Sequence, residues 1–226
     1  MSASLQALIF DMDGTMIDSM AAHTRSWLAF AHSKGLEVDI QDLMRRTTGK
    51  TGVECMGELF QRALPADEAQ GYVREKEALY RELFTPEFRE VRGFRAFAGA
   101  ARGRGLKIGV GTAGDRHNIA FAYQHLRMDT PPLATVGGDE GLPGKPAPAI
   151  FLEVARRIGV APAHCIVFED APLGIEAARR AGMRAVGICT SHSPAELGGP
   201  HVLACVDDYQ DLTRSGFLEK YHVAAA

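Results

Sequence analysis

Two carboxylates stand close together near the start of the chain, in the run Asp11-Met12-Asp13-Gly14-Thr15. They follow the apolar stretch Leu5 to Phe10, which has the length and composition of a buried strand. A strand that simply turns into a helix needs one capping acid, so the second acid exceeds that need. In parallel sheets, chemistry gathers where strands end. The spacing therefore favours a catalytic or metal-binding role for both acids.

A second acidic pair, Glu169-Asp170, follows the apolar run Cys165–Phe168. Taken alone, Asp170 could simply cap a helix that opens at Pro172. Beside the first pair it becomes a candidate divalent-metal site, because carboxylate oxygens suit Mg²⁺. The sequence shows no His/Cys cluster that would favour zinc instead.

Two further motifs suit an anion. Thr112 follows the apolar run Leu106–Gly111, and the small residues Ala113-Gly114 expose backbone amides near the next helix N-terminus. Lys145 stands in Gly144-Lys145-Pro146-Ala147-Pro148, where the prolines fix the turn and start a helix. A stiff loop suits a fixed positive charge, although a solvated loop lysine is the alternative.

These motifs need a scaffold that brings strand ends together. Short apolar runs bounded by Gly, Pro or Asp recur along the chain, and helical stretches separate them. The expected strands are Leu5–Phe10, Leu106–Gly111, Leu133–Val136, Cys165–Phe168, Ala185–Ile188 and Val202–Val206, and the expected helices are 94–104, 115–127, 147–158, 172–181 and 208–220. This alternation predicts an α/β fold with a doubly wound parallel sheet that is covered on both faces.

One segment breaks the alternation. Residues 18–88 show no convincing strand and four helical stretches, near 18–33, 39–46, 52–63 and 67–84. We therefore expect two domains. Residues 1–17 and 89–226 would form the α/β core, and residues 18–88 would form an inserted, all-helical domain.

Composition narrows the partners. The 226 residues are 46% hydrophobic and 23% charged, as in an ordinary globular protein, and the net charge of −3 disfavours nucleic acid. No apolar run approaches the roughly 18 residues of a membrane span. The stretch Ala7–Phe10 stops at Asp11 and follows no basic region, so a signal peptide is not expected. The four cysteines form no CxxC pair, which favours reduced thiols in a cytoplasmic protein.

Taken together, the motifs resemble the haloacid dehalogenase-like superfamily of aspartyl phosphotransferases. The run Asp11–Ser19 is similar to its first motif, Thr112 to the second, Lys145 to the third and Glu169-Asp170 to the fourth. The stretch from Val167 to Met183 is very similar to the subgroup of β-phosphoglucomutases and small sugar-phosphate phosphatases. The resemblance implies a Rossmann-like core with strand order 3-2-1-4-5 and identifies the helical insert with that subgroup's cap.

The resemblance also implies a mechanism, namely Mg²⁺-dependent hydrolysis of a small phosphorylated metabolite by a monomer or weak dimer. Asp11 would be the nucleophile that becomes aspartyl-phosphate. Asp13 would act as general acid and then general base, with its backbone carbonyl on Mg²⁺. The implied metal ligands are Asp11, Asp13, Asp170 and Glu169 (the last in the first or second shell), and the implied phosphate-binding groups are Gly14, Thr112, Ala113 and Lys145.

Elementary electrostatics explains why such a site needs cations. A carboxylate and a phosphate dianion about 4 Å apart repel by about 8 kcal/mol at an effective dielectric constant near 20. Mg²⁺ and Lys145 would supply the countercharge. In this superfamily dehalogenases lack the second acid and phosphonate hydrolases replace it with alanine. Asp13 therefore points to phosphoryl transfer from an ester.

The cap carries three candidate substrate contacts. His23 lies four residues before Trp27 on the first cap helix, where β-phosphoglucomutases have a histidine at a similar place, although a partly packed surface histidine is favoured. Lys76 stands on an apolar helix face, where snorkelling to solvent is favoured over gripping substrate. Lys50 lies in a cap loop beside Gly52, which stands where mutases have an arginine for a distal phosphate.

The missing arginine favours a phosphatase over a β-phosphoglucomutase-type mutase, although Lys50 could substitute for it. A phosphoacceptor signalling domain is a third interpretation, since receiver domains also combine acids, a hydroxyl and a lysine on a doubly wound sheet. Such domains lack a second acid placed as Asp13 is and need no cap.

Overall fold

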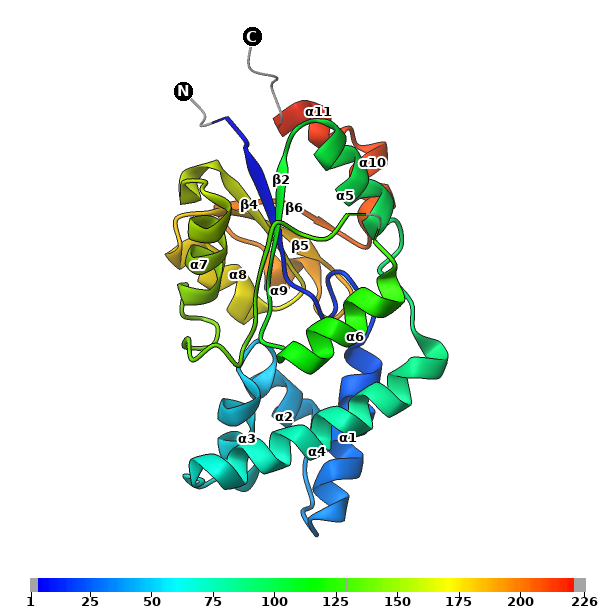
Figure 1. Ribbon diagram of the computed structural model, residues 1–226, viewed down its shortest axis with the longest axis vertical. Helices are drawn as coiled ribbons and strands as arrows, with labels where there is room; N and C mark the ends of the chain where they lie inside the picture. The colour runs from blue at the N-terminus through cyan, green and yellow to red at the C-terminus, as the bar shows by residue number, and fades with distance from the viewer. Residues whose placement is uncertain (1–3, 129, 222–226) are drawn as a thin grey trace.

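The computed structural model describes residues 4–128 and 130–221. Within those residues, one parallel sheet contains β1 (Ala7–Phe10), β2 (Lys107–Gly111), β3 (Ala134–Val136), β4 (Cys165–Glu169), β5 (Arg184–Ile188) and β6 (Val202–Val206). Their order across the sheet is β3-β2-β1-β4-β5-β6, so β1 lies in the middle (Figure 1).

The predicted doubly wound parallel sheet is confirmed. The strand order that the resemblance implied is also present, and β6 extends it beyond β5. The register sets Phe10 of β1 level with Val110 of β2 and Phe168 of β4. β4 runs one residue further than expected, because Glu169 still pairs with Gly187 on β5.

Helices cover both faces of the sheet. The core helices are α5 (Phe94–Gly103), α6 (Arg116–Leu126), α7 (Ala149–Ile158), α8 (Pro172–Arg180), α9 (Pro194–Leu197), α10 (Tyr209–Arg214) and α11 (Phe217–Tyr221), with short 3₁₀ turns η1 (Thr85–Glu87) and η2 (Pro162–His164). Leu8 and Phe10 face α5, α6, α10 and α11, whereas Ala7 and Ile9 face α7 and α8. Since successive side chains of a strand point to opposite faces, β1 is apolar throughout.

The single helix expected over 208–220 is wrong, because the chain forms α10 and α11 instead. The break falls at Ser215-Gly216, where Gly216 has φ +66°. A glycine in this left-handed conformation ends a helix without a side-chain penalty. The break lets Phe217 and Leu218 turn into the core beside the sheet.

Four helices lie beneath the core in Figure 1, namely α1 (Met20–Ser33), α2 (Ile40–Thr47), α3 (Gly52–Phe60) and α4 (Ala66–Phe84). They enclose a hydrophobic cluster of their own around Trp27, Phe30 and Met56. α3 is shorter than expected, because Gln61 adopts a left-handed conformation at φ 50°. We call these four helices the cap.

The two connecting segments between the core and the cap run side by side. Ile17 bridges Glu90, and the Asp18 N–H donates to the Arg89 carbonyl at 3.1 Å. All four cap helices lie inside the predicted insert, and its limits at residues 18 and 88 stay a prediction.

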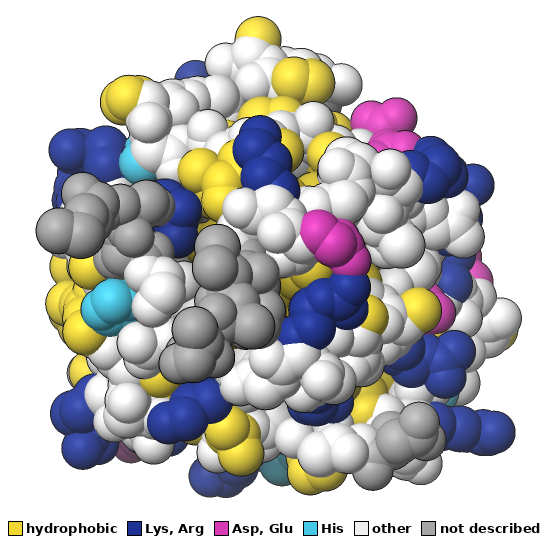
Figure 2. Space-filling model, turned by 90° about the horizontal axis from the view of Figure 1, so that it is seen from above, with side chains coloured by type: hydrophobic (Ala, Val, Ile, Leu, Met, Phe, Trp, Pro, Cys, Tyr) yellow, Lys and Arg dark blue, Asp and Glu magenta, His cyan; other side chains and the backbone are white. Residues whose placement is uncertain are grey.

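The end of the core farthest from the cap shows Lys and Arg side chains spread around the face, with hydrophobic side chains between them (Figure 2). Among the described residues, no helix combines the length and the apolar character of a membrane span. The four cysteines, all inside the described ranges, are unpaired.

Candidate active site

The sheet brings the sequence-predicted strand-end residues together. The Asp11 N–H donates to the Phe168 carbonyl at 3.0 Å, which places the end of β1 directly beside the end of β4. On the other side, the Thr112 N–H donates to the Val136 carbonyl at 3.0 Å. Asp11, Thr112 and the acidic pair at the end of β4 therefore meet at the edge of the sheet that faces the cap.

Three buried carboxylates form the centre of this edge. Asp11, Glu169 and Asp170 each offer an oxygen, and these oxygens lie within 4.8 Å of one another. Lys145 reaches into the cluster, where its ammonium contacts Asp11 Oδ1 and lies 2.5 Å from Glu169 Oε1. The positive charge of one ammonium does not balance the negative charges of three carboxylates. The charge of the cluster therefore favours a further cation.

The pKa values reflect this crowding. Burial raises the pKa of Asp11 well above its ordinary value, against the opposing charge of Lys145. Burial, followed by the charge of Glu169, raises the pKa of Asp170 to about 8. Burial would lower the pKa of Lys145, but its carboxylate neighbours outweigh that effect and raise it. A divalent cation among the carboxylates would favour their charged forms.

The residues fit a hard divalent cation. Asp170 Oδ2 is buried and, among the described residues, has no hydrogen-bond partner. An unpaired buried carboxylate oxygen is costly, and Mg²⁺ binds such oxygens. Glu169 is less available, because Oε1 accepts from Lys145 and Oε2 accepts from the Ala171 N–H at 2.9 Å. Asp11 and Asp170 are thus the better side-chain ligands, with Glu169 holding Lys145.

Gly14, a predicted phosphate-binding residue, has partners for both of its backbone polar groups. Its N–H already donates to the Ile17 carbonyl at 2.8 Å, and its carbonyl accepts from Thr190 Oγ1 at 2.6 Å. A Cβ at Gly14 would come within 2.2 Å of Asp170 Oδ2, and its φ is +74°. Gly14 therefore makes room for Asp170, and its contact with phosphate stays a prediction.

Thr112 begins the loop that precedes α6. Its side chain is buried, and its Oγ1 accepts from the Gly114 N–H at 3.0 Å, which leaves the hydroxyl hydrogen free to donate. Thr112, Ala113, Gly114 and Lys145 all line the same cavity as Asp11. In the described part of the chain, no hydrogen bond engages the Ala113 N–H. This edge offers a cation, a hydroxyl and an amide to an anion.

Asp13 lies outside the acidic cluster and faces the cap. Its Oδ1 accepts from Ser19 Oγ at 2.7 Å and Tyr80 OH at 3.1 Å, and lies 3.1 Å from His23 Nε2. Burial would raise its pKa, but His23, Ser19 and Tyr80 outweigh that and lower it to about 2. All these contacts fall on Oδ1, so Oδ2 stays available on the side of Gly114.

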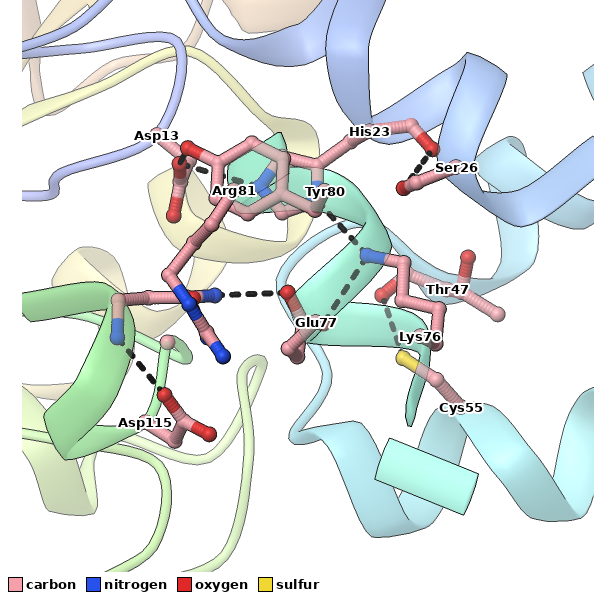
Figure 3. A network of polar contacts seen from close by, with 12 residues as sticks. Asp13, His23, Ser26, Thr47, Cys55, Lys76, Glu77, Tyr80, Arg81 and Asp115 are labelled. Carbon is pink, nitrogen blue, oxygen red and sulfur yellow. Dashed lines mark hydrogen bonds and ion pairs between the residues drawn. The ribbon is translucent and has the colours of Figure 1, made fainter. Parts of the chain in front are cut away.

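His23 and Lys76 line the same cavity as Asp13. Figure 3 shows these three side chains in one network of polar contacts. Lys76 Nζ lies 2.8 Å from His23 Nδ1 and 2.9 Å from Glu77 Oε1. An ammonium has only donors, so Nδ1 accepts and the Nε2 hydrogen faces Asp13. The favoured interpretation of a snorkelling lysine is wrong, since the Lys76 side chain is 1% exposed. The His23 side chain is 12% exposed, as a partly packed histidine is.

Lys50 also lines the cavity, but its ammonium pairs with Glu58 Oε1 at 2.7 Å. The sequence reasoning missed two residues at this place, Glu77 and Asn118. Glu77 bonds Asn118 of α6 across 41 positions of sequence. No local sequence pattern predicts a contact between residues so far apart in the sequence. The prediction that Lys76 could face the substrate was a partial signal for this part of the site.

Comparisons with known proteins agree with this geometry. Residues 5–182 match the family model of haloacid dehalogenase-like hydrolases. The fructose-1-phosphate phosphatase YqaB of Escherichia coli is 33% identical over 183 residues, which is 80% of this chain and 95% of that protein. A phosphorylated carbohydrates phosphatase of Thermotoga maritima is 27% identical over 80% of this chain and 84% of its own length. The crystal structure of β-phosphoglucomutase from Clostridium difficile superposes with a TM-score of 0.83 at 25% identity, covering 96% of this chain and 97% of that one.

Proposed function

The chain belongs to the haloacid dehalogenase-like hydrolases, and from that premise we propose that it is a Mg²⁺-dependent phosphatase of a small sugar phosphate. One observation carries the proposal. Asp11 and Asp13, two residues apart, lie in opposite surroundings: Asp11 among carboxylates and Lys145, Asp13 against the cap. Such a pair divides the work between a nucleophile and a proton carrier.

Asp11 is the nucleophile in this proposal. Its carboxylate would attack phosphorus and form aspartyl-phosphate, and water would then cleave that intermediate. Lys145, fixed by Asp11 and Glu169, offsets the repulsion between carboxylate and phosphate. A Mg²⁺ ion held by Asp11, Asp170 and the Asp13 carbonyl would supply further positive charge to the phosphoryl oxygens.

The loop after β2 would hold the transferring phosphate. Thr112 Oγ and the Ala113 N–H donate from one side, and Lys145 donates from the other. These groups bind phosphate whatever alcohol is attached to it. The core thus sets the reaction, and the cap is left to select the substrate.

Asp13 would carry the proton. In the first step it would protonate the leaving alkoxide, and in the second it would take a proton from water. Its Oδ2 is the available oxygen for this transfer, since Ser19, Tyr80 and His23 all contact Oδ1. Those donors favour the charged form of Asp13, which is the form that takes a proton from water in the second step.

The cap would recognise the sugar. We propose that it comprises residues 18–88 and that residues 1–17 and 89–226 form the core. His23 and Lys76 turn polar atoms into the cavity above Asp13, where hydroxyl groups of a sugar can bond them. The names of two relatives, a fructose-1-phosphate phosphatase and a phosphorylated carbohydrates phosphatase, support this substrate class.

Two observations weigh against a mutase. A Cβ at Gly52 would come within 2.9 Å of Val73 Cγ1, so a larger side chain has no space there. Lys50 is paired with Glu58, so it is not free to hold a distal phosphate. The cap contacts of Asp13 weigh against a phosphoacceptor domain, which needs no enclosed second acid.

A screen of sugar phosphates with Mg²⁺, scored for released phosphate and for isomerised sugar phosphate, tests the proposal. We expect phosphate release, loss of activity in excess EDTA and weaker Mg²⁺ binding by Asp170→Asn in calorimetry. Isomerised product without released phosphate would favour the mutase. A single stoichiometric phosphorylation without turnover would favour the phosphoacceptor domain.

A further inference from the structure

Asn118 of the core helix α6 stands between two side chains of the cap helix α4. Its Nδ2 donates to Glu77 Oε2 at 2.7 Å, and its Oδ1 accepts from Arg81 Nη1 at 2.7 Å. Asn118 is 2% exposed, and both contacts are partly buried. Figure 3 shows this part of the network, with Arg81 and Glu77 labelled.

The side-chain amide of Asn118 carries both a donor for Glu77 and an acceptor for Arg81. Glu77 and Arg81 are four residues apart on one helix, a spacing at which an acid and a base pair directly. Asn118 interrupts that pairing by offering a donor to the acid and an acceptor to the base. A hydrophobic residue at position 118 would leave Glu77 and Arg81 free to pair with each other.

Glu77 also holds Lys76. Its Oε1 accepts from the Lys76 ammonium at 2.9 Å, and among the described residues it is the only carboxylate paired with that ammonium. Lys76 is almost fully buried, where a cation depends strongly on its counter-ion. If Glu77 turned toward Arg81, Lys76 would lose that partner and with it a fixed position beside His23.

Asn118 is itself fixed by Asp115, which directly follows the loop residues Thr112–Gly114. Asp115 caps α6 by accepting from the backbone N–H of Asn118 at 2.9 Å, and α6 starts directly after Thr112–Gly114. The first turn of α6 therefore links the groups that line the core side of the cavity to the cap.

We propose that Asn118 is a positioning residue that fixes Lys76 over the substrate by keeping Glu77 apart from Arg81. The proposal rests on the proposed sugar-binding role of Lys76. It makes the selectivity of the cap depend on a residue of the core helix α6.

The test compares wild type, Asn118→Ala, Arg81→Met and the double variant, using the Mg²⁺-loaded protein. For Asn118→Ala we expect kcat/KM for fructose 1-phosphate to fall at least 10-fold, and kcat/KM for p-nitrophenyl phosphate to change less than 2-fold. Arg81→Met alone keeps the bond between Asn118 and Glu77 and should stay within 3-fold of wild type on both substrates.

The double variant separates positioning from packing. Removing Arg81 removes the competing partner, so Glu77 should return to Lys76 and most of the lost kcat/KM should be recovered. Additive losses in the double variant, or equal losses on both substrates, would overturn the proposal. If the alanine variant does not fold, Asn118→Ser is put through the same comparison.

A measurement without substrate keeps this proposal separate from the proposed function. Hydrogen exchange of the α4 amides should speed up at least 5-fold in Asn118→Ala, whereas the amides of β1 should be unchanged. If wild type cleaves p-nitrophenyl phosphate but no sugar phosphate, the sugar specificity fails and the exchange result alone decides. Unchanged exchange in α4 would then overturn the link between α6 and α4.

Discussion

The imidazole of His23 lies flat on the ring of Tyr80, with 3.8 Å between the ring centroids and 8° between the planes. Both side chains reach the same atom, Asp13 Oδ1. The stack joins the first cap helix to the last one directly above the proposed proton carrier. The protonation of Asp13 therefore depends on cap residues, and this dependence can be measured.

We predict that His23→Ala shifts the acid limb of the pH–rate profile to higher pH, and that Tyr80→Phe shifts it less. Both side chains help to lower the pKa of Asp13 to about 2, and His23 contributes more than Tyr80. The leaving group of p-nitrophenyl phosphate needs no proton, so Asp13 is needed only as the base that takes a proton from water. The acid limb of the kcat profile therefore follows the protonation of the Asp13 carboxylate. Tyr80→Phe keeps the stacked ring and serves as the matched control. Identical limbs in all three proteins would contradict this assignment.

Asp11→Asn and Asp13→Asn should both abolish turnover of sugar phosphates, by about 10³-fold or more, but at different steps. Without the Asp11 carboxylate no covalent intermediate can form. Without the Asp13 proton carrier, an ester with a good leaving group can still phosphorylate Asp11, and hydrolysis then stalls. Acid-quenched ³²P labelling checks this, with label expected in Asp13→Asn only. Label in Asp11→Asn would refute Asp11 as the nucleophile.

Much of the site could be predicted because its parts follow local patterns. An apolar run that ends in Asp11, Thr112 or Asp170 marks the end of a strand, and parallel strands end at one edge. The sheet therefore had to bring these residues together once the strands were recognised. The alternation of strands with helices predicted the doubly wound parallel sheet in the same way.

Contacts between distant segments were not predictable in this way. Lys76 has apolar neighbours on its own helix, and the pattern there indicates snorkelling. Its partner His23 comes from another helix, 53 positions earlier, and changes the outcome. The role of Gly14 depends on Asp170, which directly follows β4, and no spacing in the sequence reveals that contact. The break at Gly216 was different, because the glycine was a local signal that the helical pattern outweighed.

Gly14→Ala should cost Mg²⁺ affinity, whereas Gly35→Ala should not. Both glycines have a positive φ, +74° and +70°, so both substitutions strain the backbone by about 1 kcal/mol. Only at Gly14 would the new Cβ meet a side chain, 2.2 Å from Asp170 Oδ2, while nothing lies within 4 Å at Gly35. Calorimetric titration with Mg²⁺ should show at least 10-fold weaker binding for Gly14→Ala. Equal affinities in the two variants would contradict the role given to Gly14.

Lys76→Met should reduce kcat/KM for fructose 1-phosphate by about 10-fold, the order of one charge-assisted hydrogen bond. Methionine keeps most of the volume of the buried stem and removes the ammonium beside His23. A small aryl phosphate does not reach the cap contacts, so p-nitrophenyl phosphate should lose less than 2-fold. Equal losses on both substrates would show that Lys76 supports the fold rather than the sugar.

The stability that the Glu77 carboxylate contributes should be lost in acid. Burial would raise its pKa, but Lys76, His23 and Asn118 outweigh burial and lower the pKa below 4.5. A group whose pKa is lower in the folded state adds stability above its unfolded pKa and loses it as the pH falls toward the folded value.

Wild type should therefore lose melting temperature between pH 5 and pH 3, over about the range where an unfolded Glu takes up its proton. Glu77→Gln removes this titration, so its melting temperature should start lower at pH 6 and fall less steeply. Thermal unfolding of both proteins across that range checks the sign. Parallel curves would show that the carboxylate of Glu77 is not the charged partner of Lys76 in the folded protein.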